Sequence, residues 1–345
     1  MTTDHGIAEQ LARQSAHCAS MGSAFYGALF DYAAKAYDRE TALRDVLHHH
    51  GHQSVIALRL GGAAHFRALR GDAPEIAAHY PSTGGSGDPL LAWHAIVADV
   101  RDNTSTYHAL LARPVQTNEV ARSVTVLGAM LTVSDATGMP LRIYEIGSSA
   151  GLILNFDRYH YLAGDWTWGN PDSGLTLDNP FAQNDAYRLE PNLTVAERRG
   201  CDLHPLSAAN AADRDTLLGF VWPDQRERFE RLRKALRVAQ RYPVAIDAAD
   251  GTEWLEKHAR PQPGAATVAL HTVVTQHMPP PIHASFIDAV ANAGRRATKD
   301  APFAWARMEL TGEVFETSVT LWPGGREISV ARSDGHAQPL RNQAI

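Results

Sequence analysis

Cysteine is scarce in this sequence. Only Cys18 and Cys201 occur among the 345 residues, and they are far apart. Small secreted domains that depend on disulfides carry many cysteines, so this composition excludes that class and fits a reducing compartment. Residues 1–10 include Asp4 and Glu9 and have no basic segment before an apolar run, so we expect no secretory signal peptide. The sequence thus predicts a cytoplasmic protein.

Long apolar runs and an excess of basic residues are missing as well. The longest uncharged apolar stretch, residues 124–133, is too short to cross a bilayer. There are 32 lysines and arginines against 38 acidic residues, so the formal net charge is −6 and there is no electrostatic signature of nucleic-acid binding. The arginine-rich run at residues 226–241 has apolar residues at helical spacing and is predicted to be an amphipathic helix with a solvated basic face. We therefore expect neither a membrane nor a nucleic-acid partner.

The patterns that are present divide the chain in two. In residues 1–138 apolar residues recur at helical spacing, and the clearest helix follows Thr117 and ends at Gly138. After Pro140, short runs typical of β-strands alternate with helical segments, which is the pattern of a parallel sheet with crossover helices. Seven strands are predicted, at residues 141–146, 193–196, 244–246, 267–274, 303–310, 315–322 and 327–331.

The last two predicted strands are joined by residues 323–326, Pro-Gly-Gly-Arg, which indicate a hairpin turn. The predicted fold class is therefore α/β. An all-helical N-terminal region, residues 1–138, precedes a Rossmann-like domain, residues 139–345. The seven-stranded sheet of that domain is expected to be mainly parallel, with an antiparallel last strand.

A loop of small residues follows the first predicted strand. The sequence Gly-Ser-Ser-Ala-Gly occupies residues 147–151, and a helix is predicted to start near Ala150. Small residues let the backbone turn tightly and approach a ligand closely. A helix N-terminus presents free amides and the positive end of its dipole. Glu145 stands just before the loop, so the arrangement indicates a ligand site, and a strand–helix turn without a ligand is the alternative.

Three further polar residues lie at or beyond the ends of predicted strands. Asp202 is positioned to hydrogen-bond ribose hydroxyls, as an acid does in dinucleotide sites. Asp250 follows the strand at residues 244–246. Each of these acids fits equally well as a helix cap or a turn residue. His271 is a candidate general base near neutral pH, and the alternative is a core histidine held by hydrogen bonds.

Other candidates lie outside these strand ends. Gln116 and Asn118 open the helix before the Rossmann-like domain and are candidates for closing the binding site or for capping that helix. Tyr159, on the predicted first crossover helix, is a candidate substrate contact. Residues 48–52, His-His-His-Gly-His, look like a metal cluster, but adjacent histidines point in different directions and no Cys or carboxylate accompanies them. We interpret that run as an exposed loop and predict no metal site.

Six segments of the chain resemble a bacterial family known as domain of unknown function 2332. They are residues 116–119 (QTNE), 147–152 (GSSAGL), 157–159 (DRY), 202–206 (DLHPL), 221–225 (VWPDQ) and 305–309 (WARME). The family name carries no reaction and gives no catalytic residue to transfer. The resemblance implies a methyltransferase-like fold behind a helical N-terminal region.

The strand count and the loop also resemble class I S-adenosylmethionine-dependent methyltransferases, whose first motif is an acid, one residue and then Gly-x-x-x-Gly. The resemblance implies a cofactor site formed by Glu145, Gly147, Ser149, Gly151, Asp202 and Asp250. In that family an acid placed like Asp250 meets the adenine amino group. Ser149 replaces the middle glycine of the fuller family motif. The implied function is transfer of a methyl group from S-adenosylmethionine to a small molecule, with His271 as general base if the acceptor needs deprotonation.

Other functions fit parts of the same pattern. Gly-Ser-Ser-Ala-Gly is also the Gly-x-Ser-x-Gly pattern of a serine hydrolase, with Ser149 as nucleophile and Asp250 and His271 following in chain order. That fold places strands before its nucleophile, whereas residues 1–138 look helical. An NAD-dependent oxidoreductase requires an acid roughly 20 residues beyond the glycines, and Asp202 comes far later. A Rossmann-like domain that binds a ligand or a partner without turnover is the non-enzymatic alternative.

Overall fold

The computed structural model describes residues 5–53, 55–189 and 191–340. The chain forms two compact units, and each is built from two stretches of sequence. Unit 1 comprises residues 1–117 and 209–233, and unit 2 comprises residues 118–208 and 234–345.

This division differs from the predicted one at residues 138 and 139 in two respects. Residues 118–138 group with the sheet, because their helix packs on it. Residues 209–233 return to the helical unit after the chain has entered the sheet.

Unit 1 is helical throughout the described residues, as the spacing of its apolar residues predicts. Ser23 caps the second helix by accepting a hydrogen bond from the amide of Tyr26, and Asp88 caps the sixth through the amides of Leu90 and Leu91. The apolar helix faces meet in one continuous core. The α-helices are α1 (His5–Ser20), α2 (Ala24–Ala36), α3 (Thr41–His49), α4 (Ile56–Arg70), α5 (Pro74–Ala77), α6 (Pro89–Asp102), α7 (Thr104–Leu111) and α9 (Ala211–Gly219), and α10 (Arg226–Arg241) begins in this unit.

The histidine-rich run at residues 48–52 is not the exposed loop that its sequence suggests. His48 and His49 form the last turn of α3, and His50 is the C-cap residue with only 4% of its surface exposed. Helix α3 buries Leu43 and Leu47 on one face, and His50, three residues after Leu47, lies on the same face. The helical period therefore takes His50 into the core.

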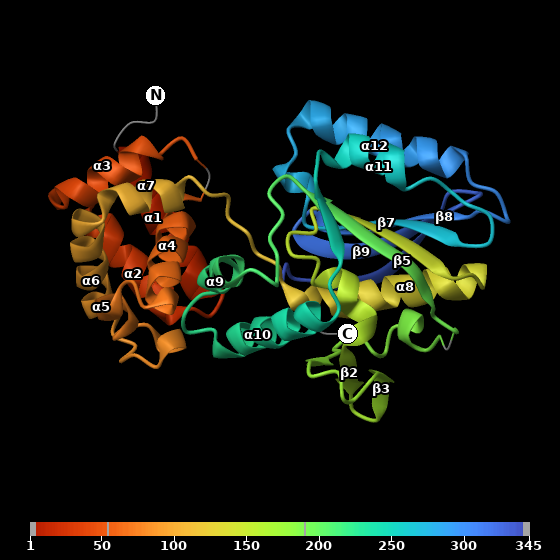
Figure 1. Ribbon diagram of the computed structural model, residues 1–345, viewed down its shortest axis with the longest axis horizontal. Helices are drawn as coiled ribbons and strands as arrows, with labels where there is room; N and C mark the ends of the chain where they lie inside the picture. Colours follow the sequence, from red (N-terminus) through yellow and green to blue (C-terminus); the bar gives the residue numbers. More distant parts are fainter. Residues whose placement is uncertain (1–4, 54, 190, 341–345) are drawn as a thin grey trace. The chain divides into compact units, whose positions relative to one another are not determined.

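Unit 2 is a layered α/β structure around a seven-stranded sheet with the order β10-β9-β8-β7-β1-β5-β6. Strands β6, β5, β1, β7 and β8 are parallel, β9 is antiparallel to β8, and β10 is antiparallel to β9. Helices α11 (Gly251–His258) and α12 (Pro280–Arg295) cover one face, and α8 (Ser123–Thr137) covers the other (Figure 1). The strands are β1 (Leu141–Ile146), β5 (Val195–Asp202), β6 (Ala245–Ala248), β7 (Ala266–Thr272), β8 (Phe303–Thr311), β9 (Val314–Trp322) and β10 (Arg326–Ser333).

The seven strands predicted for the main sheet and the C-terminal hairpin are thus confirmed. The strand that runs against the five parallel strands is β9, however, and β10, the last strand, runs in the same direction as β8, so the prediction that only the last strand opposes the others was wrong. Every residue of β7 is buried, as expected for a central parallel strand covered on both faces. Helix α8 is buried along residues 123–134, because it is apolar on all sides and packs between the sheet and the segments that follow β1. None of the helices in the described residues combines the length and the apolarity needed to span a bilayer.

The connection from β1 to β5 corrects one prediction. The sequence predicts an α-helix from near Ala150, but the chain forms a 3-10 helix and then a small sheet of strands β2, β3 and β4. Trp166 and Trp168 alternate along β3 and Tyr161 lies opposite Trp168 on β2, while Gly164, with φ 58°, and Asp165 form the two-residue turn between the strands. The turn residues and the β-forming aromatic residues of this segment therefore determine its structure more strongly than its apolar residues at helical spacing. The elements are η4 (Ile153–Arg158), β2 (His160–Ala163), β3 (Trp166–Gly169) and β4 (Thr176–Asp178).

Candidate functional site

The strand order of unit 2 reverses between β1 and β7. From β1 the chain continues to β5 and β6 on one side, and it then returns to β7 on the other side of β1. In open α/β sheets, ligands bind outside the carboxyl ends of the strands at such a reversal. The residues that follow β1 and β7 therefore form the candidate site, which lies within unit 2.

Glu145 is the buried acid of this site. It is 2% exposed, and its Oε2 atom makes no hydrogen bond to any described residue. Burial, and then the charge of Asp202, raises the pKa of Glu145 well above its usual value, while the charge of Arg122 acts in the opposite direction. Buried polar atoms without a partner are rare in folded proteins. This carboxyl group therefore calls for a proton or for a ligand that carries a donor or a positive charge.

Two residues that are not glycines have a left-handed backbone near the ends of β1 and β7. Ser149 has φ 51°, and Val273 has φ 59°. A β-branched residue with positive φ is an outlier, and such strain concentrates at ligand and catalytic sites. Ser149 is 6% exposed, and its Oγ atom also has no hydrogen-bond partner in the described part of the chain.

The glycines of the loop have a structural explanation that differs from the predicted close approach to a ligand. Gly147 has φ 72°, and a Cβ atom there would lie 2.5 Å from Cγ2 of Val274. Gly151 has φ 68°, and a Cβ atom there would lie 2.8 Å from Cδ1 of Ile246. Both positions therefore require glycine because of backbone conformation and because Val274, just after β7, and Ile246 of β6 occupy the space a Cβ atom would need.

The loop also does not present the row of free amides that was predicted. The amides of Gly147 and Ser148 donate to the Cys201 carbonyl at 2.9 and 3.0 Å, and the amide of Ser149 donates to Oδ2 of Asp202 at 2.9 Å. The amide of Gly151 donates to the Ser148 carbonyl at 2.7 Å. The element that follows the loop is the short 3-10 helix η4, which begins at Ile153, so the α-helix N-terminus predicted near Ala150 is absent.

Two more of the predicted site residues meet this loop. Asp202 accepts hydrogen bonds from the amides of Ser149 and His204, each at 2.9 Å. Asn118 donates from Nδ2 to the Ser148 carbonyl at 3.1 Å. The structure thus brings Glu145, Gly147, Ser149, Gly151, Asp202 and Asn118 to one region at the end of β1.

Three other predicted residues have different surroundings. Asp250 is exposed and caps α11 through the amides of Thr252 and Glu253, at 2.9 and 3.4 Å. Tyr159 is fully buried, and its hydroxyl donates to the Leu152 carbonyl at 2.6 Å. Gln116 belongs to the end of unit 1 and is not assigned to this site.

His271 lies under the loop that follows β7, with both ring nitrogens engaged. The indole N–H of Trp305 donates to Nε2 at 2.8 Å, so Nε2 is an acceptor and Nδ1 carries the proton. Nδ1 lies 2.7 Å from Oε1 of Glu309. Because His271 is completely buried and makes both contacts with protein groups, they favour the core histidine over the general base.

Glu309 fixes the strained segment after β7. Its Oε1 accepts from the amides of Val274 and Thr275 at 2.8 and 3.3 Å, and its Oε2 accepts from Oγ1 of Thr275 at 2.8 Å. Burial alone raises the pKa of Glu309, but the hydrogen bond from His271 and the donors of the loop outweigh it and hold the pKa below its usual value.

We expect Glu309→Gln to lower the free energy of unfolding by about 1.5–3 kcal/mol at neutral pH, because hydrogen bonds to a charged group are lost. A depressed pKa contributes stability above the unfolded value, and this stability disappears as the pH falls through the folded value. Urea unfolding of both proteins should therefore show a difference that shrinks in acid. A difference that stays constant in acid would show that the charge of Glu309 is not its cause.

The sequence interpretation missed Arg122, Val273 and Glu309. Arg122 donates from Nε to the Gly335 carbonyl at 3.0 Å and from Nη1 to the Thr272 carbonyl at 3.4 Å. A single cation at the start of the otherwise uncharged apolar stretch was the available signal for Arg122. The backbone strain of Val273 has no signature in its sequence.

One comparison with known proteins gives a match. The model of a family described as an uncharacterized protein conserved in bacteria (DUF2332) matches residues 8–342. No curated protein and no solved structure matches the chain.

Proposed function

The chain belongs to the bacterial family DUF2332, whose description assigns no reaction. From the residues at the strand reversal we propose that unit 2 binds S-adenosylmethionine and transfers its methyl group to a small molecule. The observation that carries the proposal is the buried carboxyl group of Glu145, whose Oε2 has no partner among the described residues. A buried carboxylate is costly unless a cation or several donors compensate it. A cationic ligand supplies that compensation.

The charges of the site favour a cationic ligand over a phosphate. Asp202 is close enough for its charge to act on Glu145. The loop amides that would hold a pyrophosphate donate to protein acceptors instead. S-adenosylmethionine carries an ammonium, a sulfonium and one carboxylate, whereas NAD carries a pyrophosphate. The carboxylate of an amino-acid group is also compatible with Arg122, whose charge reaches Glu145.

In this proposal each residue has a limited part. Glu145 binds the ammonium group, and Asp202 binds the ribose hydroxyls while it holds the amide of Ser149. Ser149 offers its hydroxyl as a hydrogen-bond partner, and Asn118 keeps the loop in place. The bound donor supplies an activated methyl carbon. The chain's contribution is alignment of donor and acceptor, and His271 acts as a positioning residue through Glu309.

The proposal is tested by isothermal titration of the full chain with S-adenosylmethionine, S-adenosylhomocysteine and NAD. We expect saturable binding of the first two and none of NAD. If neither of the first two binds at millimolar concentration, the assignment of the site is wrong.

Binding of the same ligand without turnover is the second candidate. The contacts of His271 favour it, because the predicted base is engaged by Trp305 and Glu309. Production of S-adenosylhomocysteine from S-adenosylmethionine in the presence of a small-molecule extract separates the two. Saturable binding without any product would favour the second candidate.

The left-handed Ser149 in Gly-x-Ser-x-Gly is the observation that favours a serine hydrolase. However, Asp250 caps α11 and His271 bonds to Trp305, so the acid and base of that hypothesis are engaged elsewhere. We expect that a fluorophosphonate leaves the wild type unlabelled and that Ser149→Ala keeps most of the ligand affinity. Labelling of the wild type that Ser149→Ala abolishes would establish the hydrolase.

A further inference from the structure

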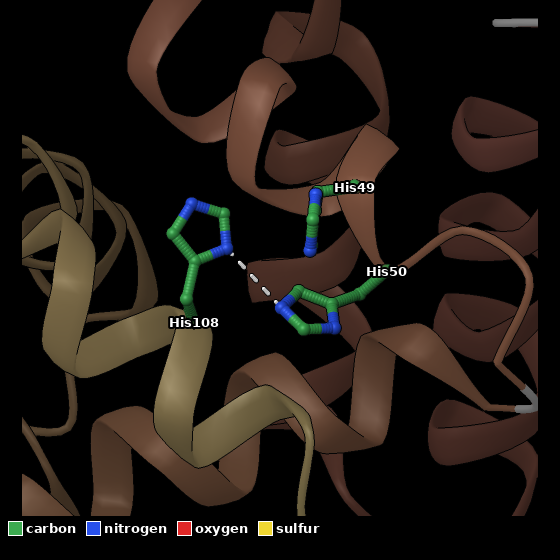
Figure 2. A group of neighbouring side chains, drawn as sticks. All are labelled: His49, His50 and His108. Carbon is green, nitrogen blue, oxygen red and sulfur yellow. Dashed lines mark hydrogen bonds between the residues drawn. The ribbon is translucent and has the colours of Figure 1, made fainter.

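Three histidines meet in unit 1, far along the chain from the site of unit 2. His49 ends α3, His50 caps it, and His108 comes from α7, 58 residues after His50. One ring nitrogen from each residue lies within 4.8 Å of the other two. Figure 2 shows the three rings around a common space, with His50 and His108 in direct contact.

The distances suit a metal ion. Nε2 of His50 lies 3.2 Å from Nδ1 of His108. A tetrahedral Zn²⁺ with Zn–N bonds of about 2.0–2.1 Å separates two ligand nitrogens by about 3.3 Å. These two rings therefore already stand at the separation that a shared ion requires. His49 is exposed at the helix end and its ring nitrogen lies within 4.8 Å of the other two, so a rotation of its side chain is the movement that would bring it into the same coordination sphere.

Gln53 supplies the outer hydrogen bond that metal-binding histidines usually have. Its Nε2 lies 3.1 Å from Nδ1 of His50, and its buried Oε1 has no hydrogen-bond partner in the described residues. The oxygen and nitrogen of a side-chain amide exchange places by a half-turn. After that turn Oε1 accepts from Nδ1–H of His50, which leaves the lone pair of Nε2 directed at His108.

The donor atoms of the cluster limit the kind of ion that it can bind. The group contains imidazoles and no carboxylate. Arg59 and His52 are also close enough to affect the charge of His50, and Arg59 donates to the carbonyls of Leu111 and Arg113. Nitrogen donors suit zinc, nickel and copper, whereas calcium and magnesium require oxygen.

We propose that His49, His50 and His108 form a binding site for one divalent late first-row transition metal ion, with Gln53 as the outer partner of His50. Three protein ligands leave a fourth position for water or an added ligand. The proposal departs from the interpretation of residues 48–52, in which adjacent histidines point in different directions and no metal site is predicted. The third ligand, His108, lies on α7, outside residues 48–52, so the sequence of that segment alone does not reveal the group.

The test uses the full chain without a histidine tag, titrated with Zn²⁺ by calorimetry and with Co²⁺ by absorption spectroscopy. We expect one ion per chain and tetrahedral Co²⁺ bands. His108→Ala should weaken Zn²⁺ binding by at least roughly tenfold, and Gln53→Ala by about 10–100-fold. His94→Ala is the matched control, because His94 is exposed on α6 and lies outside the cluster, and it should bind like the wild type.

Thermal unfolding keeps the test independent of variant folding. Zn²⁺ should raise the Tm of the wild type and of His94→Ala, since an ion that binds only the folded state stabilises it, and it should leave the Tm of His108→Ala unchanged. The proposal fails if the wild type binds no stoichiometric ion. It also fails if His108→Ala and His94→Ala bind Zn²⁺ equally well.

Discussion

Glu145→Gln is expected to weaken S-adenosylmethionine binding by at least roughly tenfold, a loss of about 1.4 kcal/mol. The substitution keeps the shape of the side chain and removes its charge, and hydrogen bonds to charged groups contribute about 1.5–3 kcal/mol. Isothermal titration measures the effect. Glu197→Gln is the matched control, because Glu197 lies on the neighbouring β5 and pairs with Arg142. Equal affinity of Glu145→Gln and the wild type would remove Glu145 from the site while leaving the fold unaffected.

The same substitution should have an opposite effect on the stability of the ligand-free protein. Burial raises the folded-state pKa of Glu145 above its unfolded value. The folded state therefore binds the proton more tightly, and wild-type stability from this group is present in acid and is lost as the pH rises toward the folded value. Glutamine does not titrate, so the stability of Glu145→Gln does not fall with rising pH for this reason. Urea unfolding at about pH 5 and about pH 8 should show the variant gaining relative stability at the higher pH.

Such a combination of weaker binding and better relative stability is a signature of a functional group. A residue that serves packing alone does not lose ligand affinity when its replacement stabilises the fold. Natural proteins retain destabilising groups where activity requires them. Parallel loss of both affinity and stability would instead place Glu145 among the structural residues of the sheet.

The sheet could be predicted from the sequence because its signals are local. Central strands such as β7 are short runs of buried residues between turn signals, and residues 323–326 mark the hairpin between β9 and β10. The hairpin of β2 and β3 also had a local signal, in the Gly164-Asp165 turn and the alternating Trp166 and Trp168 that follow it. It was missed because the same segment also has apolar residues at helical spacing, and a helix is the usual continuation after such a loop.

The candidate site was predictable only where strand ends determine it. Glu145 and Asp202 converge because they lie at the carboxyl ends of the neighbouring parallel strands β1 and β5. Arg122 and His108 reach their partners through packing of segments far apart in the chain, and no periodicity reports such contacts. The loop glycines carried a real signal with a different cause, since their Cβ positions are filled by Val274 and Ile246.

Gly147→Ala is expected to lower the free energy of unfolding of unit 2 by about 2–5 kcal/mol. A left-handed backbone costs an L-residue about 1–2 kcal/mol, and overpacking adds about 1–3 kcal/mol, because the new Cβ would lie 2.5 Å from Val274. Gly138→Ala is the matched control. Gly138 has φ 63° and nothing within 4 Å of its Cβ position, so it incurs only the backbone cost. Urea unfolding should therefore rank Gly147→Ala well below Gly138→Ala.

A double-mutant cycle with Val274→Ala isolates the clash from the backbone cost. Truncating Val274 removes the atom that the new Cβ would meet, so the double variant should lose less than the two single losses added together. The expected coupling is about 1–3 kcal/mol, the size of the overpacking cost. Additive losses would mean that Gly147 is required for its φ alone. In that case the contact with Val274 would yield freely, and the loop after β1 would remain open to the close approach by a ligand that its small residues first suggested.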